Sequence, residues 1–586
     1  MALGKAPADL VVRGGVLANV YSGELLEGWG VAVVGEQIAA IGPEAEHWIG
    51  PATVVLEAAG QVIAPGFLDA HTHLDCFQRL DLFLAAAVPT GLTAVVTETS
   101  HLSNVGGWRA VEAFLAALPG LPITVLATAP TISFLVSDRG DGVPMISAEE
   151  MARLLEEPGI IGLGEVYWPA LLEGRRDLEL LMAKAEALGK RVEGHTAGAR
   201  LRKLVASVAA GLTACHEPIT PEEVRARLRL GLYTMVRDGS VRQDIEALDG
   251  AMTGADPRRL ILVSDTVWPH HLAERGYLEA TARRATALGL TPMQALQAIT
   301  LTPAEYFRVD GRVGGLAPGR QADMVLMPRL ADFRPSLVMA RGRVLARDGR
   351  MEASIPPVVL SSEELPSPRV PRPLTLEDLR IPAPSGMDRV RVRVIEFTGE
   401  IVTQAVVREL PVCGGIVAPA PQEDLVKVVA LDRYGGGHAA RGFVAGYGLR
   451  RGALATSLTF DPANLILLGS SDPDMLAAAE RMHALGGGFV VVADGRVEAE
   501  VPMPEGGIFS NLPAPPLADA VRQAHRALHA LGCRRQDPLL SAQVLTFTAI
   551  PALRIRERGL WDVRGNCVVP LVVEPGEGGG EPHDKP

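Results

Sequence analysis

The middle of this sequence alternates between strand-like and helix-like segments, and this alternation constrains the fold more than any other feature. Helix-like segments such as RRDLELLMAKAEALGK lie between eight short apolar runs. Eight strand–helix units in a row predict parallel strands, and their economical closed arrangement is a (β/α)8 barrel of the TIM type. The strand-like runs are QVIAPGFLDA, LTAVVTE, PITVLATAP, IIGLGEVYW, RVEGHTA, LTACHE, LYTMVRDGS and LILVSDTV.

The segments around this predicted barrel have a different texture. Residues 1–64 and 315–352 both contain short strand-like runs with Gly turns, so we expect one small β-sandwich domain built from both flanks of the barrel at 65–314. A proline-rich stretch, residues 353–376, reads as a linker. Residues 377–586 again mix strand-like and helix-like segments, and we expect a separate C-terminal α/β domain.

Length and composition limit the classes of protein to which this chain can belong. Its 586 residues are too many for one ordinary hydrophobic core. The formal charge is -12 with both signs scattered, which argues against nucleic acid as a partner because phosphate binding needs a basic surface. The sequence begins without a signal pattern, and its most apolar stretch is broken by Pro89 and Gly91, so we expect a cytoplasmic protein without membrane association.

The segment GFLDAHTHLD places His71 and His73 at the end of the first predicted strand. Alternate residues of a strand point to the same side, so the two imidazoles would face one spot and suit a divalent metal ion. An isolated His-x-His pair often occurs by chance. Whether it indicates a metal site therefore depends on the residues at the ends of the other strands.

The other strand ends carry further potential ligands, where the chemistry of such barrels is located. Four histidines and two carboxylates are too many for one tetrahedral zinc ion, but they suit two divalent metal ions bridged by a carboxylate and a hydroxide. Because no thiolate is among them, Mn, Fe, Zn and Co all remain open. The six candidate ligands are His71, His73, Glu165, His195, His216 and Asp265.

With these motifs the sequence resembles the amidohydrolase superfamily and, within it, the bacterial adenine deaminases. The resemblance covers nearly the whole chain, from PGFLDAHTH, GHTAG and LTPAEYF in the barrel to GFVAGYGLRRGALATS and RGLWDV in the tail. It implies that His71 and His73 bind one metal ion, that Glu165 bridges the pair, and that the family metals are iron, manganese or sometimes zinc. It also implies that His195 and His216 bind the second ion and that Asp265 contacts the metal and the attacking hydroxide.

The sequence departs from the family in loops that we expect to face the substrate. After the second strand the family carries Asp-Pro-His-Glu where this chain reads ETSHLSNV, and after the first it carries Glu-Ser-Ser where this chain reads LDCFQ. Two adjacent aspartates and a histidine after the eighth strand become TVWPHHL, and His-Asp-Ser-His-Asn in the tail becomes FDPAN. These changes predict a reshaped substrate pocket around an unchanged metal centre.

Two carboxylates are candidates for moving protons. Asp265 is the expected catalytic base, which takes a proton and passes it to the leaving nitrogen. Glu217 follows a predicted ligand at the end of the sixth strand, so we expect it to be a proton shuttle. The alternative is that Glu217 caps the following helix or pairs with an arginine.

The candidates for substrate binding lie in the loops after the strands. Arg237 and Ser240 either hold a substrate heteroatom or form a structural turn. Trp268 either stacks on a planar ring or packs in the protein, and the loop histidines are either pocket donors or solvated. The full set is Ser100, His101, Arg237, Ser240, Trp268 and His271.

We therefore expect a binuclear metal-dependent hydrolase that acts on a C–N bond of a small nitrogen heterocycle. The first candidate is deamination of adenine to hypoxanthine and ammonia, and the alternative is opening of a cyclic amide, ureide or purine ring by the same groups. A non-catalytic scaffold of this fold is a further alternative, although such a protein would be expected to lose ligands. We also expect a homo-oligomer.

Overall fold

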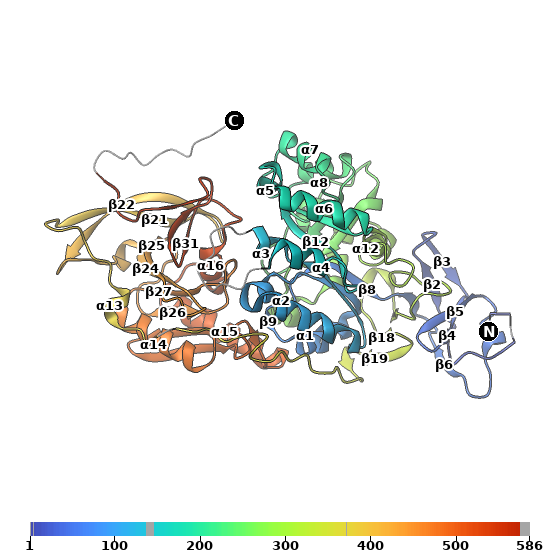
Figure 1. Ribbon diagram of the computed structural model, residues 1–586. Coiled ribbons are helices and arrows are strands. Elements are labelled where there is room, and N and C mark those ends of the chain that lie inside the picture. Colours follow the sequence, from blue (N-terminus) through green and yellow to red (C-terminus); the bar gives the residue numbers. More distant parts are fainter. Residues whose placement is uncertain (1, 4, 136–145, 371, 575–586) are drawn as a thin grey trace.

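The computed structural model of this chain describes residues 2–3, 5–135, 146–370 and 372–574. Three lobes lie roughly in a row, with a barrel in the middle, a small β-rich lobe beside the N-terminus and a C-terminal α/β lobe on the opposite side (Figure 1). Residues 575–586 of the predicted C-terminal domain lie outside the described residues.

The central lobe confirms the predicted (β/α)8 barrel. Within the described residues, eight strands form one sheet in the order β16-β15-β14-β13-β12-β11-β10-β8, and each neighbouring pair is parallel. Helices surround the barrel, so its strands are buried on both faces and read as continuous apolar runs. The strands are β8 Phe67–Thr72, β10 Leu92–Thr97, β11 Thr124–Ala129, β12 Ile160–Tyr167, β13 Arg191–His195, β14 Ala214–Cys215, β15 Tyr233–Arg237 and β16 Leu260–Val263.

The helices between the barrel strands begin where the sequence offers good caps. The Ser147 and Thr220 side chains each accept a hydrogen bond from the third backbone N–H of their helix, α4 and α8, which satisfies an otherwise unpaired donor. The main helices of this lobe are α1 Leu80–Ala87, α2 Ser100–Ala117, α4 Ala148–Leu154, α6 Arg176–Ala187, α7 Leu201–Ala209, α8 Pro221–Arg229, α9 Pro269–Arg275, α10 Leu278–Ala287, α11 Pro292–Ala298 and α12 Leu301–Phe307.

Backbone hydrogen bonds join the end of the first barrel strand to the residue that follows the last one, and these residues include candidate ligands. The backbone N–H of Asp265 donates to the carbonyl of His71 over 2.9 Å, and the N–H of His73 donates to the carbonyl of Asp265 over 2.7 Å. Closure of the barrel therefore brings residues 71–73 and 265 together at its C-terminal end.

The small β-rich lobe is a sandwich, as predicted from the two flanks. One sheet has the order β5-β4-β1-β6, and the other has the order β20-β19-β18-β17-β7-β2-β3 and so combines both flanks. Residues of both sheets, such as Val31 and Met324, share one hydrophobic core. The strands are β1 Leu10–Arg13, β2 Val16–Asn19, β3 Glu24–Glu27, β4 Gly30–Val34, β5 Gln37–Gly42, β6 Val54–Glu57, β7 Val62–Pro65, β17 Met324–Met327, β18 Leu337–Ala340, β19 Arg343–Arg347 and β20 Arg350–Met351.

The C-terminal lobe is built on a nine-stranded sheet in the order β23-β22-β21-β25-β24-β27-β26-β28-β29. Its neighbours are antiparallel except β21 and β25, which are parallel. A small three-stranded sheet, β31 to β33, follows. The elements are β21 Arg389–Phe397, β22 Thr403–Cys413, β23 Ile416–Val417, β24 Leu425–Leu431, β25 Ala439–Ala445, β26 Ala453–Thr456, β27 Leu465–Gly469, α14 Asp472–Ala484, β28 Gly488–Ala493, β29 Arg496–Pro502, α15 Ala514–Ala530, α16 Pro538–Gln543, β31 Leu553–Arg556, β32 Gly559–Asp562 and β33 Cys567–Val569.

The C-terminal lobe contacts the barrel near the end of its first strand. Strand β9 (Phe77–Gln78), directly after the His71–His73 segment, pairs in parallel with β30 (Phe509–Ser510) of the C-terminal lobe. Helix α15 packs against the barrel helix α9. These contacts hold C-terminal segments over the end of the barrel that carries the candidate ligands.

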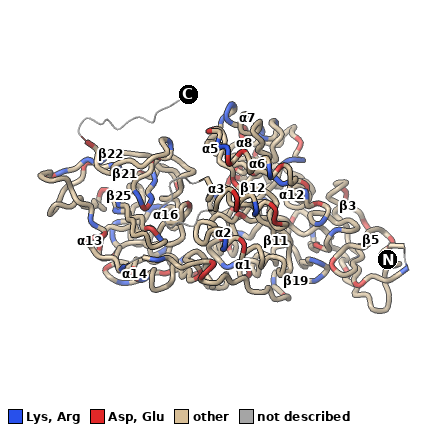
Figure 2. The backbone as a smooth tube through the Cα atoms, in the orientation of Figure 1, with Lys and Arg blue, Asp and Glu red and all other residues tan. Residues whose placement is uncertain are grey.

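Charges of both signs are interspersed over all three lobes (Figure 2). Among the helices of the described ranges, none combines the length and the apolar character needed to cross a membrane. The expected absence of a nucleic-acid partner and the domain boundaries given above stay predictions.

Candidate metal centre and substrate cavity

All six candidate ligands lie at the C-terminal end of the barrel, and two of them have an unusual backbone. Glu165 has a φ of 27° at an irregularity in the pairing of β12 with β13, and Asp265 has a φ of 61° directly after β16. Residues other than glycine adopt such angles rarely, and they persist where the surroundings hold them, often at functional sites. Both carboxylates lie near His73 Nε2, Glu165 at 3.8 Å and Asp265 at 3.6 Å.

The Glu165 carboxylate lies between the histidines of the cluster. Its Oε1 is 3.2 Å from His195 Nδ1 and 3.2 Å from His216 Nε2, while its Oε2 is 3.8 Å from His73 Nε2. Burial alone would raise the pKa of Glu165, but hydrogen bonds from His195 and His216 outweigh it and hold the pKa well below its usual range. Glu165 is therefore an ionised carboxylate that faces both histidine pairs.

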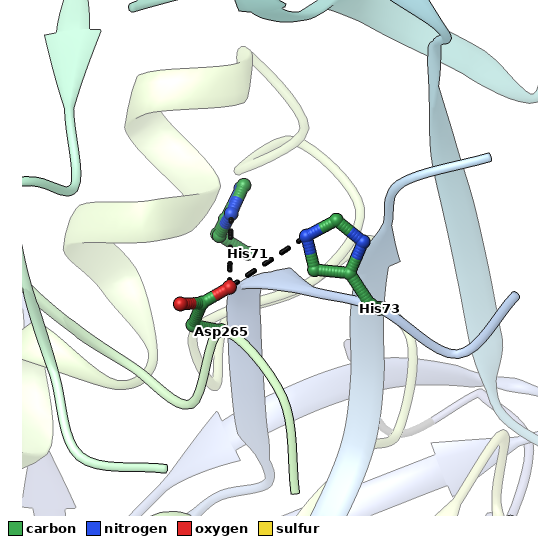
Figure 3. Close-up of side chains that lie close together, drawn as sticks. All are labelled: His71, His73 and Asp265. Carbon is green, nitrogen blue, oxygen red and sulfur yellow. Dashed lines mark ion pairs between the residues drawn. The ribbon is translucent and has the colours of Figure 1, made fainter. Parts of the chain in front are cut away.

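His71, His73 and Asp265 form the second half of the cluster (Figure 3). Asp265 Oδ1 lies 3.8 Å from His71 Nε2 and 3.6 Å from His73 Nε2, so one carboxylate oxygen faces both imidazoles. Close approach of unlike ligand atoms without direct hydrogen bonds is the spacing expected around a cation.

The donor set fits divalent metal ions. His71 Nε2 and His195 Nε2 are buried and have no hydrogen-bond partner within the described part of the chain, which is costly unless an ion or water satisfies them. Ligand atoms of His71, His73 and Asp265 lie within 4.8 Å of one another, and so do those of His71, Glu165 and His216. Imidazole nitrogens and carboxylate oxygens without thiolate suit Mn, Fe, Co or Zn.

Two acidic residues that were not predicted from the sequence lie beside candidate metal-binding histidines. Glu193 Oε2 lies 3.1 Å from His71 Nδ1, and Asp75 Oδ1 lies 3.7 Å from His73 Nδ1. Carboxylates in this position fix the tautomer and the orientation of a metal-binding imidazole. Alternation along the strand could have indicated Glu193, because it lies two residues before His195 and so faces the same side.

Glu98 is a third buried acid beside the cluster that sequence reasoning did not assign. Its Oε1 is 3.7 Å from His71 Nδ1, and neither of its oxygens has a hydrogen-bond partner among the described residues. Burial raises the pKa of Glu98 well above its usual value, and the nearby charges of Glu165 and Glu193 raise it further.

Glu217 pairs with an arginine and also faces the cluster. Its Oε1 accepts a hydrogen bond from Arg237 Nη1 over 2.7 Å and lies 3.1 Å from His216 Nε2. Burial raises the pKa of Glu217, but the charges of Arg237 and His195 outweigh it and hold the pKa well below its usual range. Glu217 therefore makes the arginine pairing that was the alternative to a proton shuttle, and it also lies at the candidate metal centre.

A cavity of about 250 Å³ opens on this centre, somewhat below the ~300 Å³ at which small-ligand pockets usually begin. From the barrel it is lined by candidate ligands and by Arg237, Ser100 and His101, whose predicted role in substrate binding stays a prediction. The C-terminal lobe closes it with residues that we call the cavity roof: Ile401, Val402, Phe460, Asp461, Val544, Phe547 and Ile550.

The roof meets the barrel through loops that depart from the family pattern. The Phe460 ring lies 5.7 Å from the His101 ring, and Asp461 accepts a hydrogen bond from the Asn104 side chain. The Phe460 and Phe547 rings are 5.0 Å apart and present an apolar wall to the cavity. The altered tail motif FDPAN and the altered loop after strand two are therefore partners in space.

Three predicted substrate-binding residues, Ser240, Trp268 and His271, are not among the residues that line this cavity. Ser240 Oγ accepts from the backbone N–H of Trp268 and lies 2.8 Å from His271 Nδ1. The Trp268 ring is buried and stacks on Phe77 at 5.0 Å. The packing alternative is thus the one that the geometry supports, because Phe77 in the altered LDCFQ segment fills the space beside the indole.

A parallel barrel with these ligands at its strand ends defines a metal-dependent hydrolase of the amidohydrolase class, and sequence comparison agrees. Residues 62–345 match the amidohydrolase family, and residues 400–567 match the adenine deaminase C-terminal domain. An adenine deaminase of Moorella thermoacetica is 36% identical over 580 residues, which cover 98% of this chain and 97% of the relative. An adenine deaminase of Rubrobacter xylanophilus is 38% identical over 589 residues, which cover 98% of this chain and 96% of the relative. This chain belongs to the adenine deaminase family of amidohydrolases.

Proposed function

We propose that this protein is a binuclear metal-dependent deaminase that converts adenine and water into hypoxanthine and ammonia. The observation that carries the proposal is the cluster of six ligands that opens on a small cavity with an apolar, aromatic roof. A flat heterocycle suits such a wall, because planar rings pack well against aromatic side chains. The activity named for the full-length relatives supports the choice of adenine.

In this proposal His71, His73 and Asp265 would hold one metal ion, His195 and His216 would hold the other, and the Glu165 carboxylate, which faces both histidine pairs, would be a ligand they share. When bound, such ions lower the pKa of water and stabilise negative charge that develops on the substrate. Mn and Fe, which the family resemblance favours, and Zn all accept this ligand set.

Protons must move because the water molecule gives up both of its hydrogens. One ends on the amino group, which leaves as ammonia, and the other ends on a ring nitrogen of hypoxanthine. Asp265 and Glu217 both line the cavity, and Arg237 Nη1 holds one oxygen of each, at 3.3 and 2.7 Å. We assign one proton to each carboxylate, because a side chain positioned to accept and return a proton speeds such transfers by about 10²- to 10⁴-fold.

Substrate positioning in this proposal uses polar groups on one wall and apolar groups on the other. Ser100 Oγ is buried without a hydrogen-bond partner among the described residues, while His101 Nδ1 lies 3.4 Å from Oδ1 of the buried Asp75. Both residues line the cavity and can bind ring nitrogens of a heterocycle, while Phe460 packs against its face.

The experiment is a substrate panel on metal-loaded enzyme, with ammonia release and ultraviolet change measured for adenine, other aminopurines, oxopurines, hydantoins and dihydropyrimidines. We expect ammonia release from adenine and weak or no reaction with ring amides. Turnover of ring amides without ammonia release would replace deamination by the ring-opening alternative.

A further inference from the structure

Arg554 on β31 is a fully buried arginine, 0% exposed, that contacts four backbone carbonyls. Its Nε donates to Ile550 over 3.0 Å, and its Nη1 donates to Val544 over 2.9 Å. Its Nη2 donates to Ile401 over 2.9 Å and to Pro551 over 3.2 Å. One guanidinium therefore joins segments that are about 150 residues apart in the sequence, as the 153-residue separation of Ile401 and Arg554 records.

Three of these carbonyls belong to the cavity roof defined above. Ile401, Val544 and Ile550 all line the cavity, and Val402 and Phe547 lie within a few residues of them in the same segments. The guanidinium lies behind the roof rather than in the cavity, since Arg554 is not among the lining residues.

Arg554 has no carboxylate partner among the described residues, and burial lowers its pKa to about 9. A buried cation is costly unless hydrogen bonds compensate it. The planar guanidinium offers five N–H donors in a fixed fork, whereas a lysine ammonium offers three donors from a single nitrogen. A single guanidinium therefore holds three segments of the cavity roof through the carbonyls of Ile401, Val544 and Ile550.

We propose that Arg554 is the positioning residue of the cavity roof, and that substrate binding depends on it although it does not touch the substrate. The inference concerns the shape of the cavity, and its kinetic part rests on the proposed adenine deaminase activity. Displacement of Ile401, Val544 and Ile550 by even about 1 Å would spoil the fit of the roof to a flat ring.

The test compares Arg554→Met, which removes the donors, with Arg554→Lys, which keeps the charge but not the fork. Arg433→Met is the matched control, because Arg433 is also buried and donates to the carbonyls of Ser457 and Gly506, which do not line the cavity. We expect KM for adenine to rise about 10- to 100-fold in Arg554→Met with unchanged metal content and a smaller change in kcat. Arg554→Lys should recover part of this loss.

Hydrogen exchange separates this inference from the proposed function. In the free, metal-loaded protein, amides of residues 399–403 and 543–550 should exchange at least about tenfold faster in Arg554→Met than in Arg433→Met, whatever the substrate. If Arg554→Met does not fold, Arg554→Lys carries the same two measurements. Unchanged exchange in these segments, or an equal rise in KM in Arg433→Met, would overturn the role of Arg554. If the two variants show the expected exchange pattern but the unmodified enzyme does not turn over adenine, only the proposed substrate would be wrong, and the role of Arg554 would stand.

Discussion

Arg237 Nη1 lies 2.7 Å from Glu217 Oε1, and this buried ion pair stands at the edge of the candidate metal centre. The same nitrogen is 3.3 Å from Asp265 Oδ2, and Arg237 Nη2 donates to Asp244 Oδ2 over 2.8 Å. Burial lowers the pKa of Arg237, but the charges of Glu217 and Asp265 outweigh it and raise the pKa above its usual value. One permanent cation thus fixes both carboxylates to which we assign protons.

Arg237→Lys should lower kcat for adenine by roughly 10- to 100-fold, because a lysine keeps the charge but cannot bridge two carboxylates and Asp244 together. Metal content by mass spectrometry should stay near that of the unmodified protein. The control is Arg284→Lys, since Arg284 pairs with Asp238 and Glu246 and does not line the cavity. Equal kcat values for the two variants would contradict a catalytic contribution of the Arg237 fork.

Glu217→Gln and Asp265→Asn keep the size of each side chain and remove its ability to accept a proton. We expect each to lower kcat about 10²-fold, the range typical of positioned acid–base groups. Steady-state rates of ammonia release measure this directly. A Glu217→Gln enzyme with unchanged kcat would leave Glu217 as the partner of Arg237 alone.

Removal of the first two imidazoles should empty part of the centre. The His71→Ala, His73→Ala double variant should lose at least one of two metal equivalents and nearly all hydrolase activity, because two ligands of one ion are missing. His529→Ala is the control, since His529 is exposed and its Nε2 contacts the Arg535 carbonyl in the C-terminal lobe. Full metal content in the double variant would show that the ligands are wrongly assigned.

Acid should weaken the contact between α9 and α15. Burial, and then the neighbouring imidazoles of His271 and His525, lower the pKa of His270 to about 3. Burial, followed by the charge of Arg275, lowers the pKa of His271 to about 4. An unfolded histidine takes up its proton near pH 6.5, so below that pH the unfolded chain binds more protons at these two positions than the folded chain does. Their contribution to stability therefore falls as the pH falls.

The measurement for this prediction is the urea midpoint of unfolding between pH 7 and pH 5. We expect a decrease in the unmodified protein and a smaller decrease in His270→Gln, which lacks one of the two titrating groups. The same decrease in both proteins would contradict the assignment to His270.

Much of the fold and of the candidate metal centre could be predicted, because both depend on short sequence patterns within single strand–helix units. The end of a parallel barrel strand fixes where a side chain lies, so His71, Glu165 and Asp265 were found from strand ends alone. Direction within a loop is not fixed in this way. Trp268 and His271 follow strand eight, but the packing of Trp268 on Phe77 and of His271 on Ser240 keeps them out of the cavity lining.

The cavity roof could not be predicted from the sequence because it depends on contacts between distant segments. Phe460 and Ile550 enter the site only when β30 pairs with β9 and the C-terminal lobe docks on the barrel. Neither residue carries a chemical signal of its own, since apolar side chains usually belong to a core. The altered FDPAN motif was the one hint, and its role as part of the roof required the structure.

The most direct test of the central claim is the reaction of adenine with the unmodified enzyme loaded with Mn or Fe. Adenine, hypoxanthine and ammonia are quantified together by chromatography and a coupled ammonia assay. The account predicts one hypoxanthine and one ammonia for each adenine consumed, with kcat/KM above about 10⁴ M⁻¹s⁻¹, the ordinary range of enzymes, and loss of this activity after chelation. Protein that holds two metal equivalents and turns over neither adenine nor another aminopurine would contradict it.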